Sequence, residues 1–269
     1  MKKKDGDWRM VGDYRAINTK MIKDKWPMPV IEDCLNRLVG GRLFVAVDLF
    51  RGYHQIPLSV ESRKFTAFST PIGHYEYLKM PFGLCNGSAV FQRMIDAVIA
   101  PLRRKGFVAY LDDVTFGGKD VTDVMEKFEL LLDTLSENGL TVNIEKTQFL
   151  KKKVNFLGHE ISEGEIKPGL EKSCAIKDFP VPTSVRNVRE FLGLANSFRR
   201  FVKEFSILAE PLTRLTKKDA DFQWDKAQQL AFERLKSVLV NRPVIVIYDP
   251  KKELELHTDA CSHGLSVIL

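Results

Sequence analysis

Apolar residues along the first 161 positions recur in two patterns. Continuous apolar runs predict buried strands, and apolar residues three or four positions apart predict amphipathic helices. The clearest strand, Leu43–Leu49, carries a single carboxylate, Asp48. The strands expected in this part are Trp8–Val11, Leu43–Leu49, Ile56–Leu58, Lys64–Ser69, Tyr75–Leu78, Phe107–Leu111, Val114–Phe116, Val154–Leu157 and Glu160–Ile161, and the helices are Val30–Leu38, Asn86–Lys105 and Val121–Asn138.

After Pro168 the pattern becomes helical, with Pro180, Pro182 and Pro211 as interruptions. Strand patterns return only at the end. The helices expected are Leu170–Phe179, Val185–Ala195, Phe198–Phe205 and Lys226–Val240, and the strands are Val244–Ile247, Glu253–Thr258 and Leu265–Leu269. The chain therefore reads as a mixed α/β part, a helical part and the beginning of a β unit.

Composition describes a soluble protein with a substantial core. The chain has 269 residues, of which 44% are hydrophobic and 28% charged, and its net charge is +6. No apolar run approaches the length of a membrane span, and the first residues lack the apolar stretch of a signal peptide, so membrane and secretory classes are excluded. The four cysteines have neither metal-site nor redox-motif spacing, which predicts reduced, mostly buried thiols in a cytosolic or nuclear protein.

The basic residues are clustered, which suits a partner with a phosphate backbone. Each cluster taken alone is more often a solvated surface, so charge makes nucleic acid a plausible partner and no more. The clusters are Lys2–Lys4, Arg103–Lys105, Lys151–Lys153, Arg199–Arg200, Lys217–Lys218 and Lys251–Lys252.

Three aspartates are the candidate chemical groups. Asp48 lies near the end of one apolar strand, and Asp112 and Asp113 lie between two others. If these strands are neighbours, three carboxylates meet at one edge, where their repulsion raises their pKa or recruits a hard cation. Two divalent ions there would stabilise a phosphoryl displacement. The alternative is a solvated turn pair and an Asp48 that caps a helix, and spacing alone leaves the question open.

The sequence around these aspartates resembles reverse transcriptases. Tyr110–Asp113 is similar to their Tyr-x-Asp-Asp box, and the companion boxes follow in the family's order. Over essentially the whole chain, the sequence resembles the pol polyprotein of gypsy-type LTR retrotransposons more than that of retroviruses. The companion boxes are Asp13–Asn18, Val47–Leu49, Gly52–Ile56, Phe65–Phe68, Met80–Asn86, Phe91–Arg93, Phe156–His159 and Phe191–Asn196.

The resemblance implies an α+β right-hand polymerase fold. Fingers and palm would occupy residues 1–161, a helical thumb and connection 162–240, and the truncated start of an RNase H-like β unit 241–269. The implied activity is RNA-directed DNA polymerisation, in which a nucleotide is transferred from a dNTP to the 3′-hydroxyl of a primer on an RNA or DNA template.

The resemblance also implies roles for single residues. Asp48, Asp112 and Asp113 would be catalytic and would bind two Mg²⁺, with Mn²⁺ as a substitute. Tyr53 would exclude ribonucleotides by occupying the space of a 2′-hydroxyl. The other implied nucleotide-binding residues are Arg9, Phe82, Gly83, Lys146 and one undetermined lysine among Lys2, Lys3 and Lys4, and the implied primer grip is Phe156, Leu157, Gly158 and His159.

These roles compete with ordinary ones. A packed tyrosine, a surface lysine and a solvated hairpin are common, although a guanidinium that can grip phosphate through two hydrogen bonds favours Arg9. Lys146 matches a lysine proposed to protonate pyrophosphate, and a plain surface lysine is equally compatible with its position.

The final segment resembles the first strand of an RNase H domain, with Asp259 as its first metal ligand. One carboxylate cannot hold two metals, so we expect no RNase H activity from this fragment. The implied partners are an RNA template, a DNA primer, their hybrid, dNTP and other parts of the same pol polyprotein, with no membrane. The implied location is the cytoplasm, within virus-like particles, with the nucleus as the alternative.

Two other functions stay open on sequence grounds. The sequence departs from the family's usual residues at Gly12, Asn86–Ser88, Phe116–Gly118 and Ser197, which fits a decaying genomic copy. Such a copy would be an inactive nucleic-acid-binding remnant. The second alternative is another palm polymerase, which copies RNA into RNA or DNA into DNA. Intact Asp48, Asp112 and Asp113 argue against the remnant, and Tyr53 argues against an enzyme that makes RNA.

Overall fold

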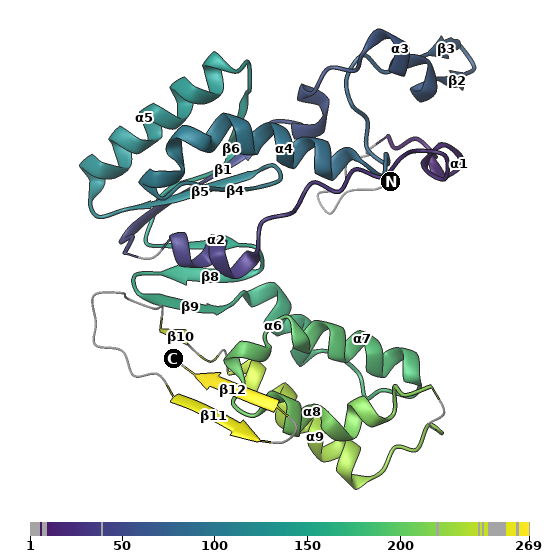
Figure 1. The fold of residues 1–269 in the computed structure, drawn as a ribbon, viewed down its shortest axis with the longest axis vertical. Helices are drawn as coiled ribbons and strands as arrows, with labels where there is room; N and C mark the ends of the chain where they lie inside the picture. The colour runs from purple at the N-terminus through teal and green to yellow at the C-terminus, as the bar shows by residue number, and fades with distance from the viewer. Residues whose placement is uncertain are drawn as a thin grey trace.

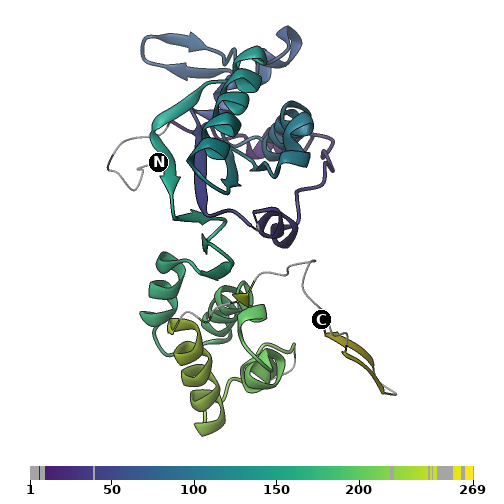
Figure 2. The ribbon, with the colours of Figure 1, turned by 90° about the vertical axis from the view of Figure 1, so that its left-hand side faces the viewer.

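The chain folds into two stacked lobes (Figures 1 and 2). The computed structural model describes residues 6, 10–38, 40–218, 221–241, 243, 245–246, 257–261 and 264–268. The upper, mixed lobe contains α1 (Arg15–Asn18), α2 (Ile31–Arg37), β1 (Leu43–Leu49), η1 (Gly52–Gln55), α3 (Val60–Arg63), η2 (Lys64–Thr66), β2 (Phe68–Thr70), β3 (Gly73–Tyr75), α4 (Gly87–Ile99), η3 (Ala100–Lys105), β4 (Val108–Tyr110), β5 (Asp113–Gly118), α5 (Val121–Glu137) and β6 (Val142–Lys151).

A four-stranded antiparallel sheet in the order β4-β5-β1-β6 forms the centre of the upper lobe. Side chains alternate along β1, so Val45, Val47 and Leu49 pack under α4 and α5, while Phe44 faces the opposite core. The apolar stripe of α4, with Phe91 and Ile95 fully buried, explains why this helix covers the sheet.

The second lobe joins a small sheet to a helical bundle. The strands of this sheet lie in the order β10-β9-β8-β7. The elements of the second lobe are β7 (Lys153–Phe156), β8 (His159–Ser162), β9 (Glu165–Pro168), α6 (Leu170–Lys177), α7 (Val185–Asn196), η4 (Arg199–Phe201), α8 (Phe205–Arg214), α9 (Lys226–Val240) and β10 (Ile245–Val246). The strands β11 (His257–Cys261) and β12 (Gly264–Ile268) pair as a separate hairpin. No helix in the described ranges is long and apolar enough to cross a membrane.

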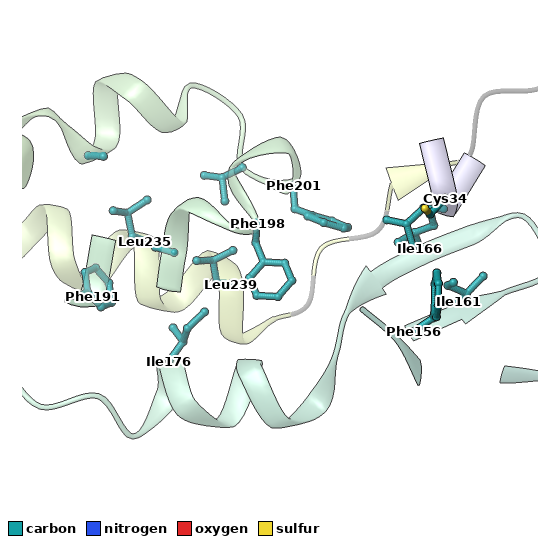
Figure 3. Packing of buried hydrophobic residues seen from close by; sticks show 14 of the residues in the cluster. Cys34, Phe156, Ile161, Ile166, Ile176, Phe191, Phe198, Phe201, Leu235 and Leu239 are labelled. Carbon is teal, nitrogen blue, oxygen red and sulfur yellow. The ribbon is translucent and has the colours of Figure 1, made fainter. Parts of the chain in front are cut away.

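One hydrophobic core connects the two lobes (Figure 3). Phe156, Ile161 and Ile166 from the small sheet lie at one end of it, close to Cys34 of α2. Phe198 and other apolar residues of the helices continue the same core. The hairpin β7–β8 is therefore packed between the aspartate-bearing sheet and the bundle.

Several predicted elements are confirmed, among them Leu43–Leu49, and others are wrong. The expected strand Lys64–Ser69 begins as the 3₁₀ helix η2, and the strand β2 starts only at Phe68. In place of a helix Phe198–Phe205, only η4 forms before Glu204 adopts a left-handed conformation. The predicted opening hairpin, up to Trp8 and Arg9, lies outside the described residues, and the three-part division of the chain stays a prediction.

Pro211 does not end a helix, contrary to the sequence expectation. It lies inside α8, where it lacks the N–H of a regular helical hydrogen bond. Ala209 and Leu212 of the same helix are buried in the core, so their packing offsets the missing bond. The cysteine expectation is also only partly right, because Cys34 is buried whereas Cys85 and Cys174 are exposed.

Candidate active site

Three aspartates lie at one end of the central sheet. Asp48 of β1 is the register partner of Asp113, the first residue of β5. Asp112 lies in the two-residue turn between β4 and β5, and its carbonyl accepts a hydrogen bond from the N–H of Leu49 (3.0 Å). The antiparallel pairing thus brings together carboxylates that are separated by more than sixty positions in the chain.

The aspartate turn is held by a buried amide. Leu111 adopts a left-handed conformation with φ of 53°, which is unfavourable for a branched side chain. The Oε1 of Gln92, on α4, accepts a hydrogen bond from the N–H of Leu111 (2.8 Å), and its Nε2 donates to the carbonyl of Ala109 (3.3 Å) and to Asp96 (3.1 Å). Gln92 is 0% exposed. These bonds fix the turn on which Asp112 is placed.

The electrostatics of the site favour a cation. The pKa of Asp113 is raised to about 6, first because surrounding protein atoms reduce the hydration of its carboxyl and then because Asp112 and Asp48 are negative, although the residue retains exposed surface. Burial also raises the pKa of Asp48, and Asp112 adds to this effect. Lys146 opposes both shifts, and Asn143, the register partner of Asp48 on β6, opposes the shift at Asp48.

The donor set fits magnesium. Carboxylate oxygens are the hard ligands that Mg²⁺ prefers, and a cation would relieve the repulsion that raises the pKa of Asp113. Within the described ranges, no three acidic, histidine or cysteine side chains form a ready-made metal cage. Mg²⁺ sites for phosphate chemistry commonly use one or two carboxylates and complete the coordination with substrate phosphates, so Asp48, Asp112 and Asp113 fit that kind of site.

The loop that follows β1 lies close to the aspartate turn. Gly52 opens η1, and a Cβ added there would lie 3.0 Å from Cζ of Phe91 and 3.2 Å from Cβ of Asp112. Glycine therefore allows η1 to approach the aspartate turn. The ring centroid of the next residue, Tyr53, lies 5.1 Å from that of Phe82 and 5.4 Å from that of Phe91. The hydroxyl of Tyr53 lies 2.9 Å from Oγ of Ser88. Tyr53 and Phe82, the two aromatic residues predicted to bind the nucleotide, therefore pack against each other.

The loop that carries Phe82 and Gly83 is clamped from the N-terminal side. The side chain of Asn18 donates to the carbonyl of Gly83 (2.8 Å) and accepts from the N–H of Cys85 (2.9 Å). Gly83 has φ of 101°, a conformation that favours glycine. Asn86, the N-cap residue of α4, makes no side-chain capping bond. Its side chain instead accepts from the N–H of Asp24 and donates to the carbonyl of Ile22.

The predicted primer grip is a tight hairpin between β7 and β8. Phe156 pairs with His159, and the two turn residues Leu157 and Gly158 have φ of 50° and 76°. His159 is buried, with ring centroids 5.4 Å from Phe198 and 5.8 Å from Phe201. Burial lowers the pKa of His159 to about 4, and the nearby cations of Lys172 and Arg200 act in the same direction.

The remaining predicted residues fall elsewhere or outside the described ranges. Lys146 is exposed and close enough to the aspartates to affect their pKa. Arg9, Lys2, Lys3 and Lys4 lie outside the described residues. Asp259 is on β11, opposite Ser266 of β12, far along the chain from the aspartate set.

Gln92 and Asn18 lie in the companion boxes Phe91–Arg93 and Asp13–Asn18, but the sequence alone predicted no supporting role for either amide or for Asn143. Gln92 lies between apolar residues on the buried face of a helix, and an amide in such a stripe signals a buried hydrogen-bonding role. The contacts of Asn18 and Asn143 could not be predicted from the local pattern, because each side chain acts on a segment that is distant in the chain.

Comparison with known proteins agrees with this geometry. Residues 1–161 match the family described as "Reverse transcriptase (RNA-dependent DNA polymerase)", and residues 224–269 match "RNase H-like domain found in reverse transcriptase". Two Drosophila melanogaster relatives are the retrovirus-related Pol polyproteins from transposon 297 (38% identity over 263 residues) and from transposon gypsy (37% over 273). Each match covers 97% of this chain, but only 25% and 26% of the relative.

Solved structures show the same architecture. The foamy viral protease-reverse transcriptase in complex with double-stranded DNA is 26% identical, with a TM-score of 0.87 over 96% of this chain and 46% of that one. The same viral protein in complex with an RNA/DNA hybrid has a TM-score of 0.76 over 90% of this chain and 33% of that one. These likenesses confirm the α+β polymerase fold. The family match over residues 1–161, together with the gypsy-type relatives, establishes that the chain belongs to the reverse transcriptase family.

Proposed function

We propose that this chain is the polymerase core of a gypsy-type retrotransposon reverse transcriptase. It extends a DNA primer on an RNA or DNA template with deoxynucleoside triphosphates. The observation that carries this proposal is the placement of Asp48, Asp112 and Asp113 at one sheet end, where the pKa of Asp113 is raised to about 6. The chain spans about a quarter of the length of its relatives, so the activity of the whole polyprotein is part of the proposal.

The side chains of the site would divide the work of nucleotidyl transfer. Asp48, Asp112 and Asp113 would hold two Mg²⁺ or Mn²⁺ ions, which when bound supply positive charge to the attacking and leaving oxygens of the displacement. Lys146 adds a further cation near the aspartates, where it can donate a proton or a hydrogen bond to departing pyrophosphate. Gln92 keeps the aspartate turn in place.

Tyr53 and Phe82 would orient the incoming nucleotide. Their rings contact each other beside the aspartate turn, where the face of Tyr53 would lie under the sugar and exclude a 2′-hydroxyl. The hairpin Phe156–His159 would hold the end of the primer. The two foamy viral structures, which contain double-stranded DNA and an RNA/DNA hybrid, support nucleic-acid partners for this chain.

The rest of the proposal concerns the setting of the enzyme. Other parts of the pol polyprotein would be its neighbours, in the cytoplasm within virus-like particles or, as the alternative, in the nucleus. Residues 224–269, which match an RNase H-like domain found in reverse transcriptase, would be the part of this chain that adjoins the ribonuclease function of the polyprotein.

Primer extension tests the proposed function. Wild-type chain, an RNA template, a DNA primer, dNTPs and Mg²⁺ should yield extended DNA, and Asp112→Asn should lower the rate by about three orders of magnitude, or about 4 kcal/mol in activation free energy. The matched control is Asp133→Asn, an exposed carboxylate on α5, which should leave the rate unchanged.

The same assay separates the alternatives. A wild-type chain that binds the hybrid but makes no product would be the inactive remnant. Extension with ribonucleotides only, or on DNA templates only, would indicate another palm polymerase.

Sugar selection tests the role of Tyr53. Tyr53→Val removes the ring, so incorporation of ribonucleotides should rise by about tenfold or more, equivalent to at least about 1.4 kcal/mol. Tyr53→Phe keeps the ring and loses only the contact with Ser88, so it should preserve discrimination. The ratio of kcat/KM for dCTP and CTP measures the effect, and an unchanged ratio in Tyr53→Val would remove Tyr53 from the sugar site.

A further inference from the structure

The turn of the β7–β8 hairpin is held in its conformation by groups outside it. Leu157 and Gly158 are both left-handed, and such a conformation persists when surrounding contacts determine it. The Gly158 carbonyl accepts from the N–H of Gly169 (2.9 Å), and the Leu157 carbonyl lies 3.1 Å from Nδ1 of His159. The N–H groups of these two turn residues donate to no protein group in the described ranges.

Lys172, on α6, lies directly against this turn. A Cβ added to Gly158 would lie 2.6 Å from Cε and 2.7 Å from Nζ of Lys172, so the missing side chain of Gly158 leaves the space that the lysine occupies. The ammonium also lies 5.2 Å from the ring centroid of Phe198, a fully buried residue of the shared core (Figure 3). Two rigid neighbours therefore set the position of the charge.

Carboxylates around the hairpin are already paired with other cations. Glu160 lies 3.9 Å from Lys153, Glu165 lies 2.8 Å from Lys167, and Arg200 lies 3.5 Å from Glu32. In the part of the chain that the structure describes, no carboxylate lies within ion-pair distance of Lys172. An ammonium has three donors, and the face of Phe198 satisfies only one side of it, so this charge can bind an anion from outside the protein.

We propose that Lys172 binds a backbone phosphate of the primer strand at the tip of the β7–β8 hairpin. This inference rests on the proposed function, since the primer is the anion that the polymerase would place against this hairpin. The ammonium and the two turn N–H groups form a small set of donors that has no sequence preference, which is what recognition of a phosphate backbone requires. Lys172 would therefore fix the primer end in register with the aspartates.

Salt dependence of binding tests the charge. Lys172→Met keeps an unbranched apolar side chain against Phe198 but removes the ammonium, and Lys172→Arg keeps a cation. Fluorescence anisotropy with a labelled primer–template hybrid should show binding about five- to tenfold weaker for Lys172→Met. The slope of log affinity against log salt should fall by about one phosphate contact. Lys172→Arg should retain most of the affinity and most of the salt slope. Lys177→Met, which alters an exposed lysine on the same helix, should change neither the affinity nor the slope.

Neutral linkages in the primer identify the phosphate. A series of primers with a single methylphosphonate in the last few linkages should contain one position that weakens binding by the wild type but not by Lys172→Met. This non-additivity is the signature of a direct contact. Equal losses in both proteins at every position, or an unchanged salt slope in Lys172→Met, would overturn the proposal. The proposal would also be overturned if Lys172→Arg lost as much binding affinity as Lys172→Met and had a lower unfolding temperature, because the lysine would then act through packing.

The two proposals can fail separately. A wild-type chain that makes no DNA but shows the Lys172-dependent slope and the methylphosphonate signature would overturn the polymerase function and leave the phosphate contact standing. A chain that extends primers normally, with binding that ignores Lys172, would overturn the contact alone.

Discussion

At the scale of single residues, a buried amide supports the turn that carries Asp112. Gln92 has no exposed surface, and all its bonds go to the segment around the aspartate turn and to Asp96. Because a left-handed Leu111 is unfavourable by itself, the turn depends on the acceptor that Gln92 supplies to its N–H. Gln92 thus fixes the position of Asp112 from the neighbouring helix α4.

Substitution of Gln92 tests this dependence. Gln92→Met keeps the length of the side chain but leaves the partly buried N–H of Leu111 without its acceptor, so the free energy of unfolding should fall by about 1–3 kcal/mol. Because the aspartate turn loosens, kcat for primer extension should fall while KM for dNTP changes little. Urea unfolding and steady-state kinetics measure the two effects. Gln223→Met, at an exposed position, is the control, and a full kcat in Gln92→Met would show that the turn holds itself.

At the scale of elements, the β7–β8 hairpin combines a strained turn with a buried histidine. The His159 ring packs on Phe198 and Phe201 and its Nδ1 lies next to the Leu157 carbonyl. Its pKa falls from 6.5 to about 4, mainly because burial disfavours the charged form. The hairpin is therefore anchored by a neutral imidazole at neutral pH.

This anchor predicts a pH-dependent stability. As pH falls below 6.5 the unfolded chain binds a proton at His159 while the folded chain does not, so stability declines until about pH 4 and then levels off. Between pH 7 and pH 5 this group should cost roughly 2 kcal/mol. His159→Phe should remove that part of the loss, as measured by urea unfolding at both pH values. Identical losses in the variant and the wild type would contradict the assignment.

The boundaries of some elements are set by tertiary packing and not by the local sequence pattern. The run Lys64–Ser69 has strand-forming residues, yet its first half is helical and Thr66, 2% exposed, donates through its hydroxyl to the Arg63 carbonyl. Pro211 reads as a helix end, yet α8 continues through it because its neighbours are buried. In both cases contacts with the rest of the fold outweigh intrinsic propensity.

At the scale of the whole molecule, the two lobes share one core. Residues of α2, β1 and β4 belong to the same hydrophobic cluster as the helices α6 to α9, with the β7–β8 hairpin between them. Two ion pairs, the exposed Arg42–Glu163 and the partly exposed Arg200–Glu32, join the same regions and contribute little to stability. The apolar core is thus the main connection between the aspartate sheet and the bundle.

A shared core predicts cooperative unfolding. Trp26 donates through Nε1 to Asp96 of α4 and so reports on the upper lobe, and Trp224 packs against the core of the bundle and reports on that part. In a Trp8→Phe background, with Trp224→Phe or Trp26→Phe to leave one reporter, fluorescence should give the same urea midpoint for both. Phe198→Ala should lower stability by about 3–5 kcal/mol at both reporters. A midpoint at Trp26 that does not respond to Phe198→Ala would indicate that the lobes unfold independently.

Motifs and apolar periodicity were enough to predict the family, the change from mixed to helical elements and the three carboxylates, because they are properties of residues close together in the chain. Three contacts became visible in the folded chain alone: Asp48 pairs with Asp113 on the adjacent strand, Gln92 holds the turn at Leu111, and Lys172 lies against Gly158. Each of these contacts joins segments separated by loops or helices. Chain topology and the burial of apolar faces select such contacts, and no local pattern encodes them.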